Sequence, residues 1–144
     1  MTISVLVDTN ILIDVFGPES PFKQWSSRVL VSLRPQAQMI LTPIVWAELA
    51  GMTPSEHHLT AVLAPLNLVR EPLPFSAAYR AGLAHADYRR SGGVRDRTLP
   101  DFFIGAHAMV RSHRLLTRDA ARYRSYFPAV EIISPETHPQ GHVE

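Results

Sequence analysis

The 144-residue sequence contains no cysteine, which excludes zinc–thiolate centres, thiol nucleophiles and disulfide bonds. It has no apolar run near the ~20 residues that a membrane-spanning helix needs. Its first residues form a strand-like segment instead of a basic and apolar leader. We therefore expect a cytoplasmic protein that does not associate with membranes. Its length suits one domain that buries roughly 70% of its extended-chain surface.

Several catalytic motifs are also missing. The seven histidines do not form a His-Glu-x-x-His motif, so we do not expect a histidine metal site. A Gly-x-Ser-x-Gly elbow and a glycine-rich phosphate loop are absent as well. These absences argue against zinc proteases, serine hydrolases and nucleotide-binding folds.

Lysine is almost absent, because Lys23 is the single lysine among 14 basic residues and the net charge is only +1. The arginine guanidinium offers a planar fork that suits phosphate. An arginine-rich codon usage explains the same bias. The composition therefore permits a nucleic-acid substrate without requiring one.

Apolar, strand-like segments alternate with helical patterns, which predicts an α/β fold with a central, mainly parallel sheet. The expected strands are residues 3–7, 38–41, 66–69, 114–116 and 130–133. The expected helices cover about 10–16, 43–52 and 101–111, with others opening after Pro21, Thr53-Pro54 and Pro74. We expect one domain at 1–134 and a disordered tail at 135–144.

Four acidic residues occupy positions that favour a shared site. Asp8 and Asp119 follow two of the expected strands, and Asp101 opens a helix. Ligands of open parallel sheets bind at the carboxyl ends of the strands. Glu48 lies in an apolar helical segment, where a glutamate is rarely buried without a partner.

Each of these acids also has a simpler interpretation. Asp8 and Asp119 could cap the helices that follow them, and Asp101 could complete a capping box with Thr98. Glu48 could reach solvent from the flank of its helix. Capping and metal binding are compatible, so these alternatives stay open. Four clustered carboxylates repel one another, and Mg²⁺ or Mn²⁺ relieves that repulsion through oxygen ligands.

Four segments carry a more specific pattern, in this order: VDTNILI at 7–13, TPIVWAEL at 42–49, LPDFFIGAHA at 99–108 and LLTRD at 115–119. Together they resemble the PIN-domain ribonucleases, and within these the VapC-type toxins of bacterial toxin–antitoxin pairs. One departure is Phe102-Phe103, where the family usually has small or aliphatic residues. We expect this departure to alter core packing and not chemistry.

The resemblance implies a three-layer α/β/α fold and a catalytic, metal-binding set formed by Asp8, Glu48, Asp101 and Asp119. It implies a Mg²⁺- or Mn²⁺-dependent endoribonuclease that leaves 5′-phosphate and 3′-hydroxyl ends. It also implies a cognate antitoxin protein and a homodimer. The alternative is a catalytically inactive PIN-like module that binds RNA or protein, and the presence of all four acids argues against it.

Other residues receive subsidiary roles. The resemblance places Thr9, Asn10 and Thr117 near the metal as supporting residues, although ordinary helix-start chemistry also explains Thr9 and Asn10. Asp96 rivals Asp101, but Asp101 has the family's spacing; Asp14 and Asp87 are expected on solvated helix faces. The candidate RNA-binding residues, which solvated loop charge explains equally well, are Arg95, Arg97 and Arg118.

Overall fold

The computed structural model describes residues 3–93 and 97–144. Its described strands form one parallel sheet in the order β3-β2-β1-β4-β5. The strands are β1 (Ile3–Val7), β2 (Ala37–Leu41), β3 (Val69–Arg70), β4 (Arg114–Leu116) and β5 (Ile132–Ile133). The helices are α1 (Thr9–Phe16), α2 (Lys23–Leu33), α3 (Pro43–Ala50), α4 (Glu56–Leu63), α5 (Phe75–Arg90), α6 (Leu99–Val110) and α7 (Ala121–Arg124).

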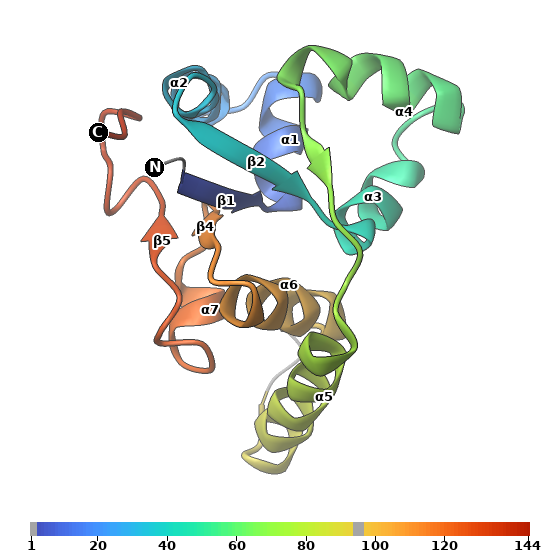
Figure 1. Cartoon of the computed structure of the whole chain (residues 1–144), viewed down its shortest axis with the longest axis vertical. Helices are drawn as coiled ribbons and strands as arrows, with labels where there is room; N and C mark the ends of the chain where they lie inside the picture. Colours follow the sequence, from blue (N-terminus) through green and yellow to red (C-terminus); the bar gives the residue numbers. More distant parts are fainter. Residues whose placement is uncertain (1–2, 94–96) are drawn as a thin grey trace.

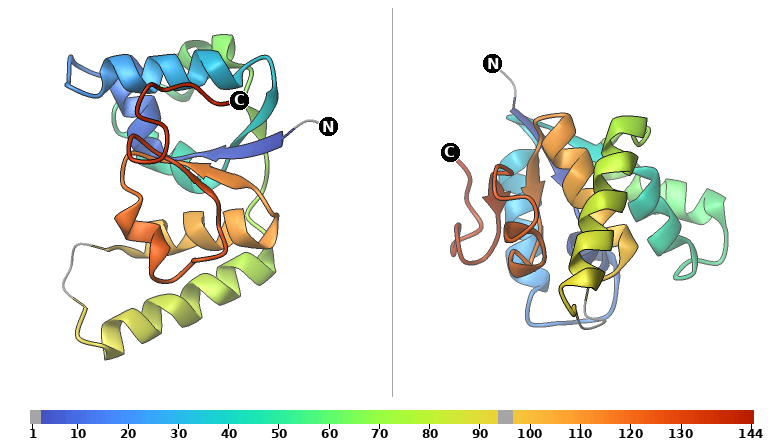
Figure 2. Two further views of the ribbon diagram at one scale, coloured as in Figure 1. Left: turned by 90° about the vertical axis from the view of Figure 1, so that its left-hand side faces the viewer. Right: turned by 90° about the horizontal axis from the view of Figure 1, so that it is seen from below.

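The sheet lies between two helical layers (Figure 1). Helices α1 and α2 cover one face, while α5 and α6 pack together on the other (Figures 1 and 2). This arrangement confirms the predicted three-layer α/β/α fold. Within the described residues, no helix combines the length and apolar character that a membrane span would need.

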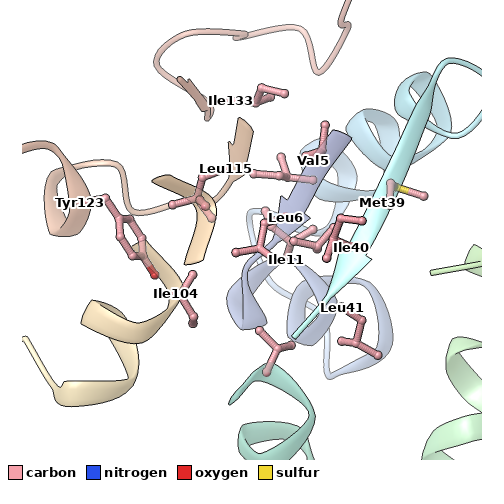
Figure 3. Packing of buried hydrophobic residues seen from close by; sticks show 14 of the residues in the cluster. Val5, Leu6, Ile11, Met39, Ile40, Leu41, Ile104, Leu115, Tyr123 and Ile133 are labelled. Atoms are coloured by element: carbon pink, nitrogen blue, oxygen red, sulfur yellow. The ribbon is translucent and has the colours of Figure 1, made fainter. Parts of the chain in front are cut away.

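Strand β1 is the centre of the sheet and of the core. Leu6 aligns with Ile40 of β2 on one side and with Leu115 of β4 on the other, and all three are fully buried. A parallel strand covered on both faces is apolar at every position, which explains the unbroken apolar character of residues 5–7. Figure 3 shows these side chains packed with residues from α1 and α6.

The two edge strands begin later than the sequence pattern predicted. Residues Ala64–Leu66 form a 3₁₀ turn, and Asn67 follows with a left-handed φ of 53°. This turn consumes the first part of the expected strand at 66–69, so β3 starts at Val69. Similarly, Val130 lies in a turn, and β5 is limited to Ile132–Ile133.

Residues 135–144, expected to be a disordered tail, lie against α2 (Figure 2). The indole of Trp25 donates a hydrogen bond to the carbonyl of His138 at 2.7 Å. Ser32 accepts one from the backbone N–H of Val143 at 2.9 Å, and the Val143 side chain is 2% exposed. One buried valine and these hydrogen bonds hold the segment against α2, although its polar composition with two prolines predicted disorder.

Helix α6 packs closely against aromatic side chains. Phe102 is buried among Tyr88, Tyr126 and Phe127, with ring centroids 5.3–6.3 Å apart. A Cβ atom built on Gly105 would lie only 2.3 Å from the Phe127 ring. The glycine is therefore required by the close approach of that ring.

The far end of α6 is held by a polar cluster. Nε2 of His107 and Nε2 of His113 each lie 2.8 Å from the same Glu71 oxygen, and Arg111 Nε lies 3.3 Å from it. Burial alone would raise the pKa of Glu71, but the hydrogen bonds from His113 and His107 lower it to about 2. Burial lowers the pKa of His107, so this imidazole is neutral. The cluster ties the loop after β3 to α6 and to the start of β4.

The two helical glycines provide a matched test of packing. Gly105→Ala should destabilise the protein by about 1–3 kcal/mol, because the added methyl group overpacks the Phe127 contact. Gly82→Ala in α5 meets no atom within 4 Å and should stabilise it by up to about 1 kcal/mol. Chemical denaturation measures both; a neutral Gly105→Ala variant would contradict the close approach.

Removing the Glu71 carboxylate should change stability in a pH-dependent way. Its lowered pKa contributes about 3 kcal/mol that is present above pH 4.5 and is lost as the pH falls towards 2. Glu71→Gln should therefore lower the free energy of unfolding at pH 7 and flatten its decline in acid. Glu131→Gln, which breaks an exposed pair with Arg114, is the control and should change little. Equal effects of the two substitutions would contradict a stabilising role for the polar cluster around Glu71.

Candidate functional site

Asp8 occupies the carboxyl end of the central strand. Its backbone N–H donates to the carbonyl of Leu116 at 2.9 Å, which places it between the ends of β1 and β4. Its side chain also accepts a hydrogen bond from Thr9 N at 2.7 Å and caps α1. The capping interpretation and the site interpretation therefore both apply to this residue, which is 5% exposed.

Two hydroxyl groups fix the second oxygen of the Asp8 carboxylate. Thr117 Oγ1 and Tyr123 OH each donate to Oδ2 at 2.8 Å. Figure 3 shows the Tyr123 ring extending from α7 towards α6 and the sheet. Burial raises the pKa of Asp8 to about 6, and the charge of Asp101 adds to the effect, while the two hydroxyl donors oppose it. A positive charge beside this carboxylate would favour its ionised form.

Glu48 reaches the same edge from helix α3. Thr42 caps that helix directly after β2, and Pro43 occupies its first turn. Thr9 Oγ1 donates a hydrogen bond to Glu48 Oε1 at 2.7 Å. Thr9 therefore contacts both acids, because its backbone N–H donates to Asp8. Glu48 is otherwise exposed, as the solvent-facing interpretation expected.

Asp101 and Asp119 are joined by an arginine. Arg122 Nε lies 2.6 Å from Asp119 Oδ2, and its Nη1 lies 3.5 Å from Asp101 Oδ1. The backbone N–H of Thr98 donates to Asp101 at 3.0 Å in a capping box, so this alternative also holds. Asp101 is buried, whereas the Asp119 side chain is 42% exposed.

The three supporting residues lie within this network. Thr117 Oγ1 donates to Asp8 and accepts from the backbone N–H of Asp119 at 3.0 Å. Asn10 Nδ2 lies 3.3 Å from Thr117 Oγ1, and its amide oxygen accepts from Arg118 N at 3.2 Å. Thr9 bonds Glu48, as described above. These contacts orient the acids by hydrogen bonding.

Two of the three candidate RNA-binding arginines, Arg118 and Arg97, have protein partners. Arg118 Nε donates to Asp14 at 2.6 Å, and its guanidinium lies 4.2 Å from the centre of the Phe22 ring. Asp14 is therefore buried and paired, not solvated as expected. Arg97 donates to Ser125 at 2.6 Å and to the carbonyl of Ala121. Arg95, like the rival acid Asp96, lies outside the described residues.

Sequence reasoning missed Arg122 and Tyr123 as members of the site. They follow Asp119 by three and four residues, which is the spacing of neighbours across one helical turn. That spacing was the available signal, because a helical turn after Asp119 returns their side chains to the acids.

The donor set suits a hard divalent cation, since it consists of carboxylate oxygens with hydroxyl groups behind them. Thr9 links Asp8 to Glu48, Thr117 links Asp8 to the backbone of Asp119, and Arg122 joins Asp119 to Asp101. Within the described part of the chain, a group of three or more possible metal-ligand side chains with atoms within 4.8 Å of one another is formed by Glu71, His107 and His113, and not by the four acids.

That second cluster is poorly suited to a metal. Nδ1 of His107 is buried and has no hydrogen-bond partner among the described residues. A metal on Nε2 would place a proton on this atom, whereas ligating histidines normally donate that proton to an acceptor. Arg111 adds a positive charge to the same Glu71 oxygen. The oxygen-only edge around Asp8 is therefore the better candidate.

Comparison with known proteins agrees with this architecture. Chains in three solved assemblies share the fold: VapBC2 from Rickettsia felis (TM-score 0.69, 16% identity), VapBC-1 from nontypeable Haemophilus influenzae (0.69, 19%) and a toxin–antitoxin complex from Klebsiella pneumoniae (0.65, 23%). The alignments cover 91–92% of this chain and 97–98% of those chains. No curated protein sequence matches. Residues 5–127 match the PIN domain family, and the chain therefore belongs to that family.

Proposed function

We propose that this protein is a Mg²⁺- or Mn²⁺-dependent endoribonuclease and the toxin of a toxin–antitoxin pair. The observation that carries the proposal is the network at the carboxyl edge of the sheet. Hydrogen bonds of Thr9 and Thr117 and the ion pairs of Arg122 join Asp8, Glu48, Asp101 and Asp119, although these acids come from four separate segments. An RNA- or protein-binding module would not need this arrangement of like charges.

The side chains would divide the work of the reaction. Asp8, Glu48, Asp101 and Asp119 would hold the cation. When bound, the divalent ion supplies Lewis-acid activation of the attacking water and stabilisation of the phosphate oxygens. Thr117 and Tyr123 hold the Asp8 carboxylate in one orientation, and Thr9 does the same for Glu48. Arg95, Arg97 and Arg118 remain candidates for contacts with the RNA backbone.

An apolar hollow lined in part by the residue that follows Glu48 supports an antitoxin partner. It has a volume of about 280 Å³ and lies between α1, α3 and α4. Leu12 of α1 and Leu49 of α3 line it, and Leu49 adjoins Glu48. An antitoxin segment with an apolar anchor here and a basic residue over the acids would cover the site. The toxin–antitoxin complex from Klebsiella pneumoniae contains a chain of this fold.

We also propose a homodimer through α5. Phe75, Tyr79 and Leu83 are 96%, 70% and 55% exposed and follow one another at helical spacing. Exposed apolar patches of this kind commonly mark interaction sites, and a two-fold axis would let the patch cover itself.

Substitution of single acids should abolish cleavage without unfolding the protein. Asp101→Asn and Glu48→Gln should each reduce cleavage of RNA in Mn²⁺ by about 100-fold or more, because each removes a charged metal ligand. Asp87→Asn, on the exposed face of α5, is the matched control and should remain active. Wild-type cleavage by either site variant, with a native circular dichroism spectrum, would favour the binding-module alternative.

The dimer has a separate test. Light scattering should give the wild type twice the monomer mass of 16.1 kDa, and the double variant Tyr79→Glu plus Leu83→Glu should give the monomer mass. Charged side chains on both copies of the patch would repel across the axis. Val31→Glu introduces the same charge at an exposed residue of α2 and should leave the dimer intact. An unchanged mass for the double variant would exclude this interface.

A further inference from the structure

Arg122 places a positive charge in direct contact with two of the four acids. It projects from α7, with Nε 2.6 Å from Asp119 Oδ2 and Nη1 3.5 Å from Asp101 Oδ1. Its side chain is 44% exposed, so it lies at the boundary between the acids and solvent. The neighbouring arginines have other partners, because Arg118 pairs with Asp14 and Arg124 with Glu136.

The position of Arg122 answers an electrostatic need. Asp8 and Asp101 are both buried, and their mutual repulsion contributes to the raised pKa of Asp8. Burial alone would lower the pKa of Arg122, but the charges of Asp101 and Asp119 raise it. The guanidinium therefore stays charged, and it compensates the negative charges of Asp101 and Asp119, which would otherwise repel each other.

The same contacts obstruct a metal ion. Asp101 and Asp119 are two of the acids that would hold a cation, and Arg122 contacts one oxygen of each. A guanidinium and a divalent cation on the same two carboxylates would repel each other. Each therefore weakens the binding of the other, and this coupling is reciprocal.

We propose that Arg122 is a built-in counter-ion of the acid cluster, which neutralises Asp101 and Asp119 in the metal-free protein and is displaced when a divalent cation binds. This inference rests on the proposed function, because the competing ion is the proposed metal. Arg122 is a positioning residue in this scheme. The exposed half of its side chain gives the guanidinium a route into solvent when it leaves the acids.

The first experiment measures metal affinity without any reaction. Isothermal titration with Mn²⁺ compares the wild type, Arg122→Gln and Arg124→Gln. Arg122→Gln should bind Mn²⁺ more tightly by about fivefold or more, because the ion no longer competes with the guanidinium. Arg124→Gln removes the same charge from the same helix, away from the acids, and should bind like the wild type. In EDTA, Arg122→Gln should melt below both other proteins.

A second experiment needs no variant and covers the case in which Arg122→Gln does not fold. The Nε–Hε signal of Arg122 is followed by NMR in the wild type as Mg²⁺ is added. The signal should move towards the position of a solvated arginine as its pair with Asp119 breaks. The Arg124 signal should stay in place.

The outcomes separate this inference from the proposed function. If neither the wild type nor natively folded Arg122→Gln binds Mn²⁺, the proposed metal site fails and the displacement fails with it. If the wild type binds Mn²⁺ but Arg122→Gln, natively folded, binds it equally or more weakly, only the counter-ion role is overturned. An Arg122 signal that is unchanged at saturating Mg²⁺ would overturn it as well.

Discussion

The burial of the Asp8 carboxylate at the end of β1 is the constraint on which the rest of the site depends. Its environment raises its pKa to about 6, so the carboxylate stays there only with compensating donors. Thr117 arrives from the end of β4 and Tyr123 from α7, and both donate to the same oxygen. The central strand, its neighbour β4 and the last helix are thereby tied to one atom. A cation at this edge would relieve the remaining unfavourable charge.

Helix α6 is anchored by charge at both of its ends, and the two anchors have opposite characters. In its first turn, Asp101 faces the exposed guanidinium of Arg122, which can exchange its partner. In its last turn, the buried His107 faces Glu71, which also bonds His113 and Arg111. The histidines of the second cluster are buried, with side chains 0% and 6% exposed, which suits a permanent contact. The adaptable end lies at the acids, where ligands would bind.

Sequence reasoning predicted the fold well because its strongest signal was local. The apolar strands 3–7 and 114–116 and the Thr42-Pro43 helix start are properties of short segments, and the structure confirms them. The short edge strands were placed less well, because a 3₁₀ turn took part of the expected β3. Arg122, the Asp14–Arg118 pair and the histidine clamp depend on contacts between segments far apart in sequence. In the sequence these residues look like ordinary surface residues, because their partners lie far away along the chain.

The position of β1 at the centre of the sheet has a consequence for synthesis on the ribosome. Asp8 emerges early, but the strand that flanks it on one side begins at Arg114, and Asp119 follows later still. Pairing between such distant segments closes a long loop and comes late in folding. For most of translation, a nascent chain therefore contains Asp8 but lacks β4 and Asp119, which complete the acidic edge of the sheet. If the protein is a toxin, a ribosome that makes it is exposed to the activity only after nearly the whole domain has been released.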